Sequence, residues 1–244
     1  MAILAIDTAS VNCSVLVERV KDSDRCRSVE EIGRGHAERL IPMIGRVLAE
    51  AGADYDDLRA IVVTIGPGTF TGIRVGLSAA RGFGLALDIP VIGVPVLHAH
   101  ALKAFRMVSG MDESVLVLLN ASRGDVFAER FSRQGSSDWP ESLSKGALLE
   151  NEALNHRLFE AVPDGGESIN LAGSGAAAAK PVLEECGRDV RIIHEHAAPD
   201  IDSVADLGIR MYQDGMYTSP PDPLYLRKPD AKPQKMAPLF AGHR

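Results

Sequence analysis

Residues 61–88 read IVVTIGPGTFTGIRVGLSAARGFGLALD, and this is the most informative stretch of the chain. An apolar run of strand type leads directly into the glycine-rich turn GPGTFTG. A run of helix-forming and small residues follows the turn. The pattern predicts a buried strand at 60–65, a tight turn, and a helix at 73–87, which indicates an α/β fold.

The turn itself has two interpretations. The backbone amides at the start of a helix can cradle a phosphate group. The segment is not a phosphate-binding P-loop, however, because Ile73 and Arg74 stand where Lys and Ser or Thr would be required. The glycines would otherwise serve only to supply the positive φ angles of a tight turn. Both interpretations stay open at this point.

Small residues recur along the helix that follows, at Gly72, Gly76, Ala80 and Gly84. One face of the helix therefore carries almost no side chain, although an interior glycine costs about 1 kcal/mol relative to alanine. A helix that accepts this cost needs something to approach its backbone closely. The candidates are its own sheet, the neighbouring helix expected at 36–51, and another subunit.

The remaining elements follow from apolar periodicity and turn residues. Further strands are expected at 2–7, 13–19, 26–32, 90–94, 115–120, 125–131, 169–173 and 190–193. Further helices are expected at 36–51, 97–105, 147–160 and 203–214, and after the small-residue run at 174–179. We expect a first lobe at 1–105, a second lobe at 106–217, and an extended, proline-rich tail at 218–244. Both lobes start with a strand, a turn and a strand, which hints at duplication.

Composition narrows the class of protein. The chain has 244 residues, 45% of them hydrophobic, which is ordinary for an ordered globular protein. A net charge of -7 makes it a poor free-standing nucleic-acid binder, so any service to RNA would go through a partner. No apolar run is long enough to span a membrane. Three cysteines at unrelated spacings favour a cytoplasmic protein over a disulfide framework.

Two short segments are candidates for nucleotide binding. Asp7 ends the first expected strand and is followed by Thr8, and an acid with hydroxyl groups there can hold a hydrated magnesium ion and phosphates. A capping or turn-forming aspartate is just as common. Gly173 and Gly175, in the run AGSGAAAA, could flank an adenine ring or could begin a closely packed helix.

The histidines do not indicate a metal site. His98 and His100 are two residues apart, as are His194 and His196, and residues with this spacing do not share a helix face. No cysteine or carboxylate pattern accompanies them. No nucleophile elbow is present, and no catalytic constellation is assembled in the sequence. We therefore expect neither a catalytic residue nor a bound metal in the isolated chain.

Several segments together resemble the TsaB (YeaZ) family. They are ILAIDTA at 3–9, GHAERLIPMI at 35–44, GPGTFTGIRVGLSAARGFGLAL at 66–87, PVIGV at 90–94 and PLYLR at 223–227. The resemblance runs from residue 1 to about residue 230, and its GPGTFTGIRVG block is the specific part. It implies a two-lobed actin-like ATPase (ASKHA) fold with mixed sheets flanked by helices.

The resemblance also implies a role. It makes the chain a non-catalytic partner of TsaD, which transfers a threonylcarbamoyl group from its adenylate to the tRNA adenosine next to the anticodon, with the ATPase TsaE as third member. The free chain would be a homodimer, tRNA would be contacted only through the complex, and ATP or ADP would bind, if at all, at the interface with the partner. An autonomous actin-like ATPase or kinase and, less favoured, a metalloprotease are the alternatives.

Family likeness places the partner surface on the helices at 36–51 and 73–87. The residues expected there are Leu40, Ile44, Val47, Gly72, Gly76, Ala80 and Gly84. Where the catalytic relative has two metal-binding histidines, the matching positions here are Val96 and His100, so half of that site is missing. The second lobe begins with Asn120 where the family usually has an acid, which weakens the case for magnesium-assisted phosphoryl transfer.

Overall fold

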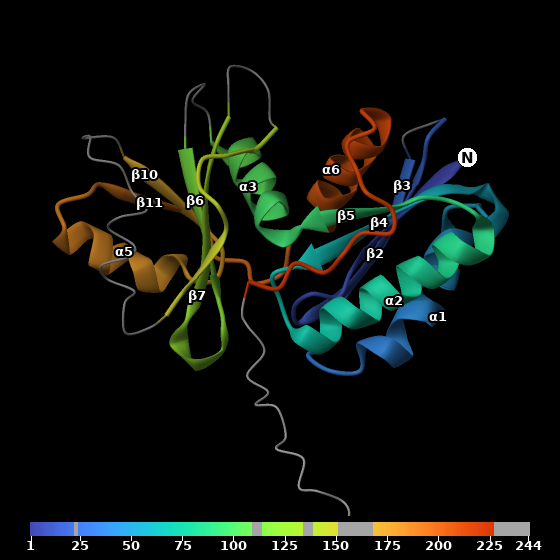
Figure 1. The fold of residues 1–244 in the computed structure, drawn as a ribbon, viewed down its shortest axis with the longest axis horizontal. Coiled ribbons are helices and arrows are strands. Elements are labelled where there is room, and N and C mark those ends of the chain that lie inside the picture. The colour runs from blue at the N-terminus through green and yellow to red at the C-terminus, as the bar shows by residue number, and fades with distance from the viewer. Residues whose placement is uncertain (22–23, 109–113, 134–138, 151–167, 227–244) are drawn as a thin grey trace, which may run out of the picture.

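The computed structural model describes residues 1–21, 24–108, 114–133, 139–150 and 168–226, which form two α/β lobes side by side (Figure 1). The first lobe contains β1 (Ala2–Asp7), β2 (Asn12–Arg19), β3 (Asp24–Glu31), α1 (His36–Glu50), a 3₁₀ turn (Tyr55–Asp57), β4 (Leu58–Gly66), α2 (Phe70–Leu87) and β5 (Val91–Pro95). Helix α3 (Val96–Met107) leads into the second lobe. That part of the chain contains β6 (Ser114–Asn120), a 3₁₀ turn (Ser122–Gly124), β7 (Val126–Ser132), β8 (Glu141–Ser142), β9 (Ala147–Leu149), β10 (Ile169–Ala172), α5 (Ala176–Glu185), β11 (Val190–His194) and α6 (Ile201–Gln213).

The two lobes repeat one topology. Among the described residues, the first sheet has the order β3-β2-β1-β4-β5 and the second the order β11-β10-β6-β7-β8, with β9 also paired to β7. In each sheet a hairpin of antiparallel strands, β1–β2 or β6–β7, is followed by two parallel strands. The strand–turn–strand pattern that begins both halves of the sequence therefore does reflect a repeated unit.

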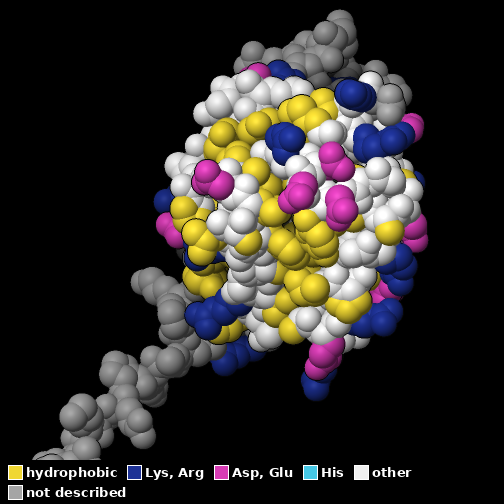
Figure 2. Space-filling model, turned by 90° about the vertical axis from the view of Figure 1, so that its right-hand side faces the viewer, with side chains coloured by type: hydrophobic (Ala, Val, Ile, Leu, Met, Phe, Trp, Pro, Cys, Tyr) yellow, Lys and Arg dark blue, Asp and Glu magenta, His cyan; other side chains and the backbone are white. Residues whose placement is uncertain are grey.

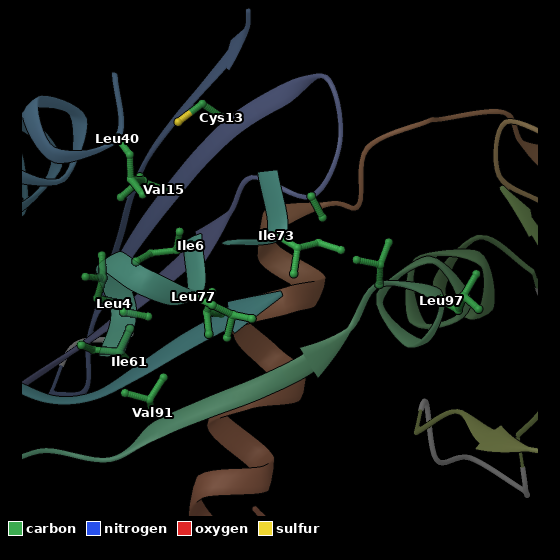
Figure 3. Close-up of a cluster of buried hydrophobic side chains, with 14 of the residues drawn as sticks. Leu4, Ile6, Cys13, Val15, Leu40, Ile61, Ile73, Leu77, Val91 and Leu97 are labelled. Atoms are coloured by element: carbon green, nitrogen blue, oxygen red, sulfur yellow. The ribbon is translucent and has the colours of Figure 1, made fainter. Parts of the chain in front are cut away.

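The first sheet is buried on both faces because helices cover each of them, and its central strands β1 and β4 are apolar at most positions. Leu4 and Ile6 of β1 face α1 and α2, whereas Ile3 and Ala5 face α3 and α6. The α1–α2 side is the larger cluster, and Figure 3 shows its side chains converging from the strands and both helices, with Leu40 beside Val15. The same cluster continues into the second lobe through Phe131 and Ala172.

Helix α6 corrects the expected division of the chain. The range 106–217 assigned it to the second lobe, but its buried residues Val204, Ala205 and Leu207 pack on β1, β4 and β5 of the first sheet. Gly208 allows this contact, because a Cβ there would lie 2.2 Å from Cγ1 of Val62. The chain therefore returns to the first lobe after β11, a crossing that apolar periodicity alone does not encode.

Another expectation concerns a helix in the second half of the chain. The helix expected at 147–160 is wrong at its start, because residues 147–149 form β9 and pair with β7; the rest of it, from residue 151 on, lies outside the described residues. The apolar side chains there fit a strand as well as a helix, and pairing with β7 decides between the two structures. In the described residues, no helix combines the length and the apolar character needed to cross a bilayer.

The first residues of the expected tail pack on the first lobe. The backbone amide of Val91 donates to Oγ of Ser219, and the amide of Leu224 donates to the carbonyl of Ile65 at 2.8 Å. Arg81 of α2 donates to the carbonyl of Pro221. Residues 218–226 thus run beside β5 and β4 without forming helix or strand, and residues 227–244 lie outside the described residues.

Candidate functional site

The small-residue face of α2 points into its own lobe. A Cβ at Gly72 would lie 2.0 Å from the carbonyl oxygen of Thr8, and one at Gly84 would lie 2.5 Å from Cγ2 of Val91. Gly76 is equally close to Oγ1 of Thr8, and Ala80 is fully buried. The close approach for which these glycines are required is therefore the contact of α2 with β1, β4 and β5.

The residues expected to meet a partner are consequently interior residues. Leu40, Ile44 and Val47 of α1 are no more than 1% exposed, and the four small residues of α2 are buried as well. The sequence pattern correctly located the two helices, but the residues that it selected lie on the faces that cover the sheet. An assignment of these seven residues to an exposed interface is wrong for this chain on its own, with Leu40 alone reaching the surface groove described next.

A groove of about 480 Å³ lies between the outward faces of α1 and α2. Most of its lining is apolar or small: Ala37, Leu40, Ile41, Phe70, Thr71, Arg74, Val75, Ser78 and Ala79. Ile41 and Phe70 are 46% and 55% exposed, which is high for side chains of this size. Exposed apolar surface that continues along two neighbouring helices is typical of a protein-binding site.

One end of the groove is built from three side chains of two segments. The guanidinium of Arg74 lies 3.6 Å above the ring of Phe70 and its Nε donates to the hydroxyl of Tyr225 at 3.2 Å. The rings of Phe70 and Tyr225 are 5.6 Å apart. Arginine and aromatic side chains dominate binding energy at many interfaces. Sequence reasoning missed Tyr225, although its segment PLYLR was part of the family pattern.

The surface of the first lobe carries further apolar area. Figure 2 views the end of the molecule that lies at the right of Figure 1, and apolar side chains run down the middle of this face. Acidic side chains gather on one part of it and basic side chains lie mainly near its edge. Charges of both signs beside apolar surface can give an interface specificity without a dominant charge of one sign.

Asp7 lies at the end of β1 and is completely buried. Its Oδ1 accepts hydrogen bonds from Oγ1 of Thr64 at 2.8 Å and from the amide of Ala9 at 3.1 Å. Its Oδ2 has no hydrogen-bond partner among the described residues. Burial raises the pKa of this carboxyl to about 6, and the two hydrogen bonds only partly oppose the rise.

The glycine-rich turn closes over the residues next to Asp7. The amide of Thr69 donates to the carbonyl of Ala9 at 2.8 Å, and a Cβ at Gly68 would lie 2.2 Å from that same oxygen. Thr8 is buried and its hydroxyl donates to the carbonyl of Gly72. The turn therefore packs against the β1–β2 connection, and the amides of Thr69 and Gly72 are hydrogen-bonded within the chain. This geometry favours the structural interpretation of GPGTFTG over a phosphate cradle.

The glycine-rich turn of the second lobe also packs against a strand of its own lobe. Gly173 has a φ of 97°, and a Cβ there would lie 2.3 Å from the carbonyl of Leu118, which also accepts the amide of Gly175. Asn120 at the end of β6 donates from Nδ2 to the carbonyl of Ser174 at 2.8 Å. A carboxylate could not donate this bond. Asn120 thus holds the glycine turn to β6, and the two expected nucleotide segments each pack within their own lobe.

The histidines come together in a way that their spacing did not predict. His100 of α3 stacks on His194 of β11 with ring centroids 5.4 Å apart, and His194 stacks on His196 at 5.3 Å. Burial lowers the pKa of His100 to about 3 and that of His98 to about 4. Val96 is buried in the core. In the described part of the chain, no three His, Cys, Asp or Glu side chains are placed to hold a metal ion together.

A comparison with known proteins first identifies the class of protein to which this chain is similar. A family model described as "TsaD: tRNA N6-adenosine threonylcarbamoyltransferase" matches residues 30–232. The solved structure of YeaZ from Pseudomonas aeruginosa superimposes with a TM-score of 0.76 at 27% identity, covering 92% of this chain and 99% of that one. The fold is therefore the two-lobed actin-like ATPase fold that the sequence segments implied.

Sequence relatives then give the particular family. The tRNA threonylcarbamoyladenosine biosynthesis protein TsaB of Escherichia coli is 30% identical over 229 residues, which are 93% of this chain and 95% of that protein. A tRNA N6-adenosine threonylcarbamoyltransferase of Erythrobacter litoralis is 39% identical over 117 residues, but these are only 34% of its length. The chain belongs to the TsaB family.

Proposed function

We propose that this chain is a non-catalytic subunit of the machinery that makes threonylcarbamoyladenosine in tRNA. It would support TsaD in transferring the threonylcarbamoyl group from threonylcarbamoyl-AMP to the adenosine next to the anticodon, with TsaE as third member. The observation that carries this proposal is the apolar groove between α1 and α2, on a chain whose glycine turns are both closed. Membership of the TsaB family supports the pathway.

The residues at the ends of β1 and β6 support a non-catalytic role. Actin-like phosphoryl transfer needs carboxylates that hold magnesium at the ends of strands in both lobes. Here Asp7 is enclosed with a raised pKa, and Asn120 occupies the corresponding end of β6. We therefore assign the chain a scaffolding or activating role, and ATP or ADP, where it binds, to the interface with TsaD.

The partner surface of this proposal is the outward groove. Ile41 and Phe70 would insert into TsaD, or into a second copy of the chain when TsaD is absent, and Arg74 would hold the ring of Phe70 in place. The net charge of -7 supports contact with tRNA through the complex alone. All three cysteines are free, which supports a reducing compartment such as the cytoplasm.

The experiment that tests the proposal is reconstitution of threonylcarbamoyl transfer to tRNA, with this chain, its TsaD and TsaE each left out in turn. We expect activity only when this chain and TsaD are both present, and none from this chain alone. Full activity without this chain would overturn the role. Transfer by this chain without TsaD would overturn the non-catalytic assignment.

Interface variants test the surface in the same assay. Ile41→Asp places a charge in the groove without filling the interior, because Ile41 is already half exposed. We expect at least a tenfold loss of TsaD affinity by calorimetry and a parallel loss of transfer. Leu143→Asp in the second lobe, where Leu143 is 51% exposed, is the matched control and should bind like wild type. If Ile41→Asp and Leu143→Asp bind TsaD with equal affinity, the groove is not part of the interface.

An autonomous ATPase or kinase is the second candidate, favoured by the position of Asp7 at the end of β1. Calorimetric titration of the isolated chain with ATP and magnesium separates the two functions. We expect no saturable binding, since both glycine turns are closed. A dissociation constant in the micromolar range would favour the kinase class.

A further inference from the structure

The described part of the chain ends beside the groove between α1 and α2. After α6 the chain returns to the start of α2 (Figure 1), where the hydroxyl of Tyr225 accepts from Nε of Arg74 at 3.2 Å. The ring of Tyr225 is 5.6 Å from that of Phe70. Leu226, the last described residue, is partly buried against the core. The remaining residues, 227–244, therefore continue from a fixed point at this end of the groove.

The groove offers an apolar surface to whatever lies next to it. Within the described residues, Ile41 remains 46% exposed and Phe70 remains 55% exposed. The volume of about 480 Å³ is large enough for several side chains of an occupant. Covering these side chains removes apolar area from water, which favours any apolar segment that can reach them.

The last 18 residues of the sequence contain one apolar run. They read RKPDAKPQKMAPLFAGHR, and residues 236–240 within them are MAPLF. The nine residues before this run are mainly charged or proline. Pro238 disfavours a helix or a sheet ladder there. Extended segments that contain proline bind grooves lined by aromatic side chains at a low cost in conformational entropy. The run therefore has the composition of a groove-binding segment.

The distance along the chain allows the run to reach the groove of its own molecule. Residue 236 follows residue 226 by ten positions, which span at most about 33–36 Å when extended. The side of the groove formed by α2, from Phe70 to Ala79, is about 14 Å long. A tether of this length gives an effective concentration of about 1 mM. Even a submillimolar affinity is therefore enough to keep the groove occupied in most molecules.

Charge favours the same contact. Residues 227–244 have five Lys and Arg residues and one Asp, a net charge of +4. The whole chain has a net charge of -7, which leaves -11 for residues 1–226. Glu38, in the first turn of α1 and three residues before Ile41, is exposed at the edge of the groove. Attraction between exposed charges is weak, so it guides the basic segment toward the groove and the apolar run provides most of the binding.

We propose that residues 236–240 dock into the groove between α1 and α2 of their own molecule, with Leu239 and Phe240 against Ile41 and Phe70. The docked segment then covers the surface assigned to TsaD or to a second copy of the chain. A partner has to displace it, and this lowers the apparent affinity of the partner. The competition rests on the proposed function of the groove, whereas the docking itself does not.

A labelled peptide tests the docking without any partner protein. The peptide has the sequence of residues 227–244, and the protein is the full chain with Leu239→Ser and Phe240→Ser, whose groove is left open. We expect saturable binding by fluorescence anisotropy with a dissociation constant below about 0.3 mM. Wild type should bind the peptide at least threefold more weakly, because its own segment competes. No saturable binding, or equal affinity for wild type, overturns the proposal.

Further substitutions in this double variant locate the peptide. Ile41→Asp should abolish binding by placing a charge in the apolar groove, although it adds attraction for a basic peptide. Leu143→Asp, at an exposed position of the second lobe, adds the same charge elsewhere and should leave binding unchanged. Equal binding by these two variants would mean that charge alone holds the peptide, and it overturns docking in the groove.

Affinity for partners tests the competition. The double variant should bind TsaD more tightly than wild type by the same factor as the peptide, at least threefold, because one competitor is removed in both cases. It should also self-associate more tightly in sedimentation velocity. Weaker self-association than wild type overturns docking within one molecule, because the segment would then hold a second copy. Unchanged affinity for TsaD overturns the competition if Ile41→Asp weakens TsaD binding. If Ile41→Asp does not weaken it, the proposed function of the groove is wrong, and the peptide titration still decides the docking.

Discussion

The inward and outward faces of α2 differ in the size of side chain that they can accommodate. The inward face has Gly72, Gly76, Ala80 and Gly84 against the backbone of Thr8 and the side chains of β4 and β5. The outward face keeps Phe70 and other side chains at a groove. Recurring glycine indicates that something lies close, but it does not say what. Here the helix approaches its own sheet, and this leaves the opposite face free for a partner.

The largest expected effect breaks the inward contact. Gly72→Ala places a Cβ 2.0 Å from the carbonyl oxygen of Thr8, a backbone atom that cannot move without displacing β1. We expect a loss of about 4 kcal/mol in the free energy of unfolding. Urea denaturation followed by circular dichroism measures it, and loss of soluble protein would be the same result in stronger form.

Gly82→Ala is the control on the same helix. A Cβ at Gly82 meets nothing within 4 Å and the residue is exposed. Alanine is the better helix former there, so we expect a gain of about 0.5–1 kcal/mol. Substitutions of one type on one helix should thus have opposite signs. Similar stability in the two variants would show that the inward face is not closely packed.

The second prediction concerns Asp7, which lies next to the inward contact. Its pKa rises from 3.8 to about 6 on folding, so the folded chain binds the proton more tightly than the unfolded chain. The stability that this proton gives is present below pH 3.8 and is lost as the pH rises to about 6. At 1.36 kcal/mol per unit, the ionised carboxyl costs roughly 3 kcal/mol at neutral pH.

Asp7→Asn removes this cost and keeps an oxygen for Thr64 and Ala9. We expect the variant to be more stable than wild type by roughly 2–3 kcal/mol at pH 7.5, and the difference to disappear toward pH 4. Buried His98, His100 and His194 have lowered pKa values and give the opposite slope, but they are present in both proteins. Urea denaturation at several pH values measures the difference. A wild type that is the more stable of the two at pH 7.5 would contradict the prediction.

The sequence predicted the fold well wherever local apolar patterns are strong. Strands β1, β2, β4 and β6 lie within a few residues of their expected ranges because each contains a continuous buried run, and helices α1 and α2 do so because their buried residues recur at helical spacing. Helix α6 was assigned to the wrong lobe, and residues 147–149 to the wrong element. Both depend on which distant strand provides the contact, and that information is not local.

The candidate sites were less predictable. The small-residue pattern located α2 correctly but not the direction of its glycines, since that direction depends on Thr8 and Val91. His100 and His194 belong to elements 94 residues apart and meet only because α3 and β11 pack together. Their two-residue spacings from other histidines carried no signal for this contact. On α1, Ile41 is exposed whereas its neighbour Leu40 is buried, a difference that only the structure shows.

The third prediction concerns the second lobe, where the side chain of Asn120 holds the glycine-rich turn at Ser174. Asn120→Asp removes the hydrogen bond from Nδ2 to the carbonyl of Ser174 and places a carboxylate beside that oxygen. Because Asn120 is exposed, we expect a loss of only about 1 kcal/mol. Urea denaturation measures it. A more stable Asn120→Asp protein would show that the turn does not depend on this bond.

The smallest expected effect is on the outward face. Tyr225→Phe keeps the ring against Phe70 and removes only the hydroxyl that accepts from Nε of Arg74. The bond is exposed, so we expect the free energy of unfolding to change by no more than about 0.5 kcal/mol. Affinity for TsaD should fall about threefold, because a freed Arg74 must be ordered again on binding. Calorimetry and urea denaturation on one preparation separate the two quantities. Unchanged affinity for TsaD, together with a stability loss well above about 0.5 kcal/mol, would mean that the Tyr225 hydroxyl serves the fold and has no part in binding.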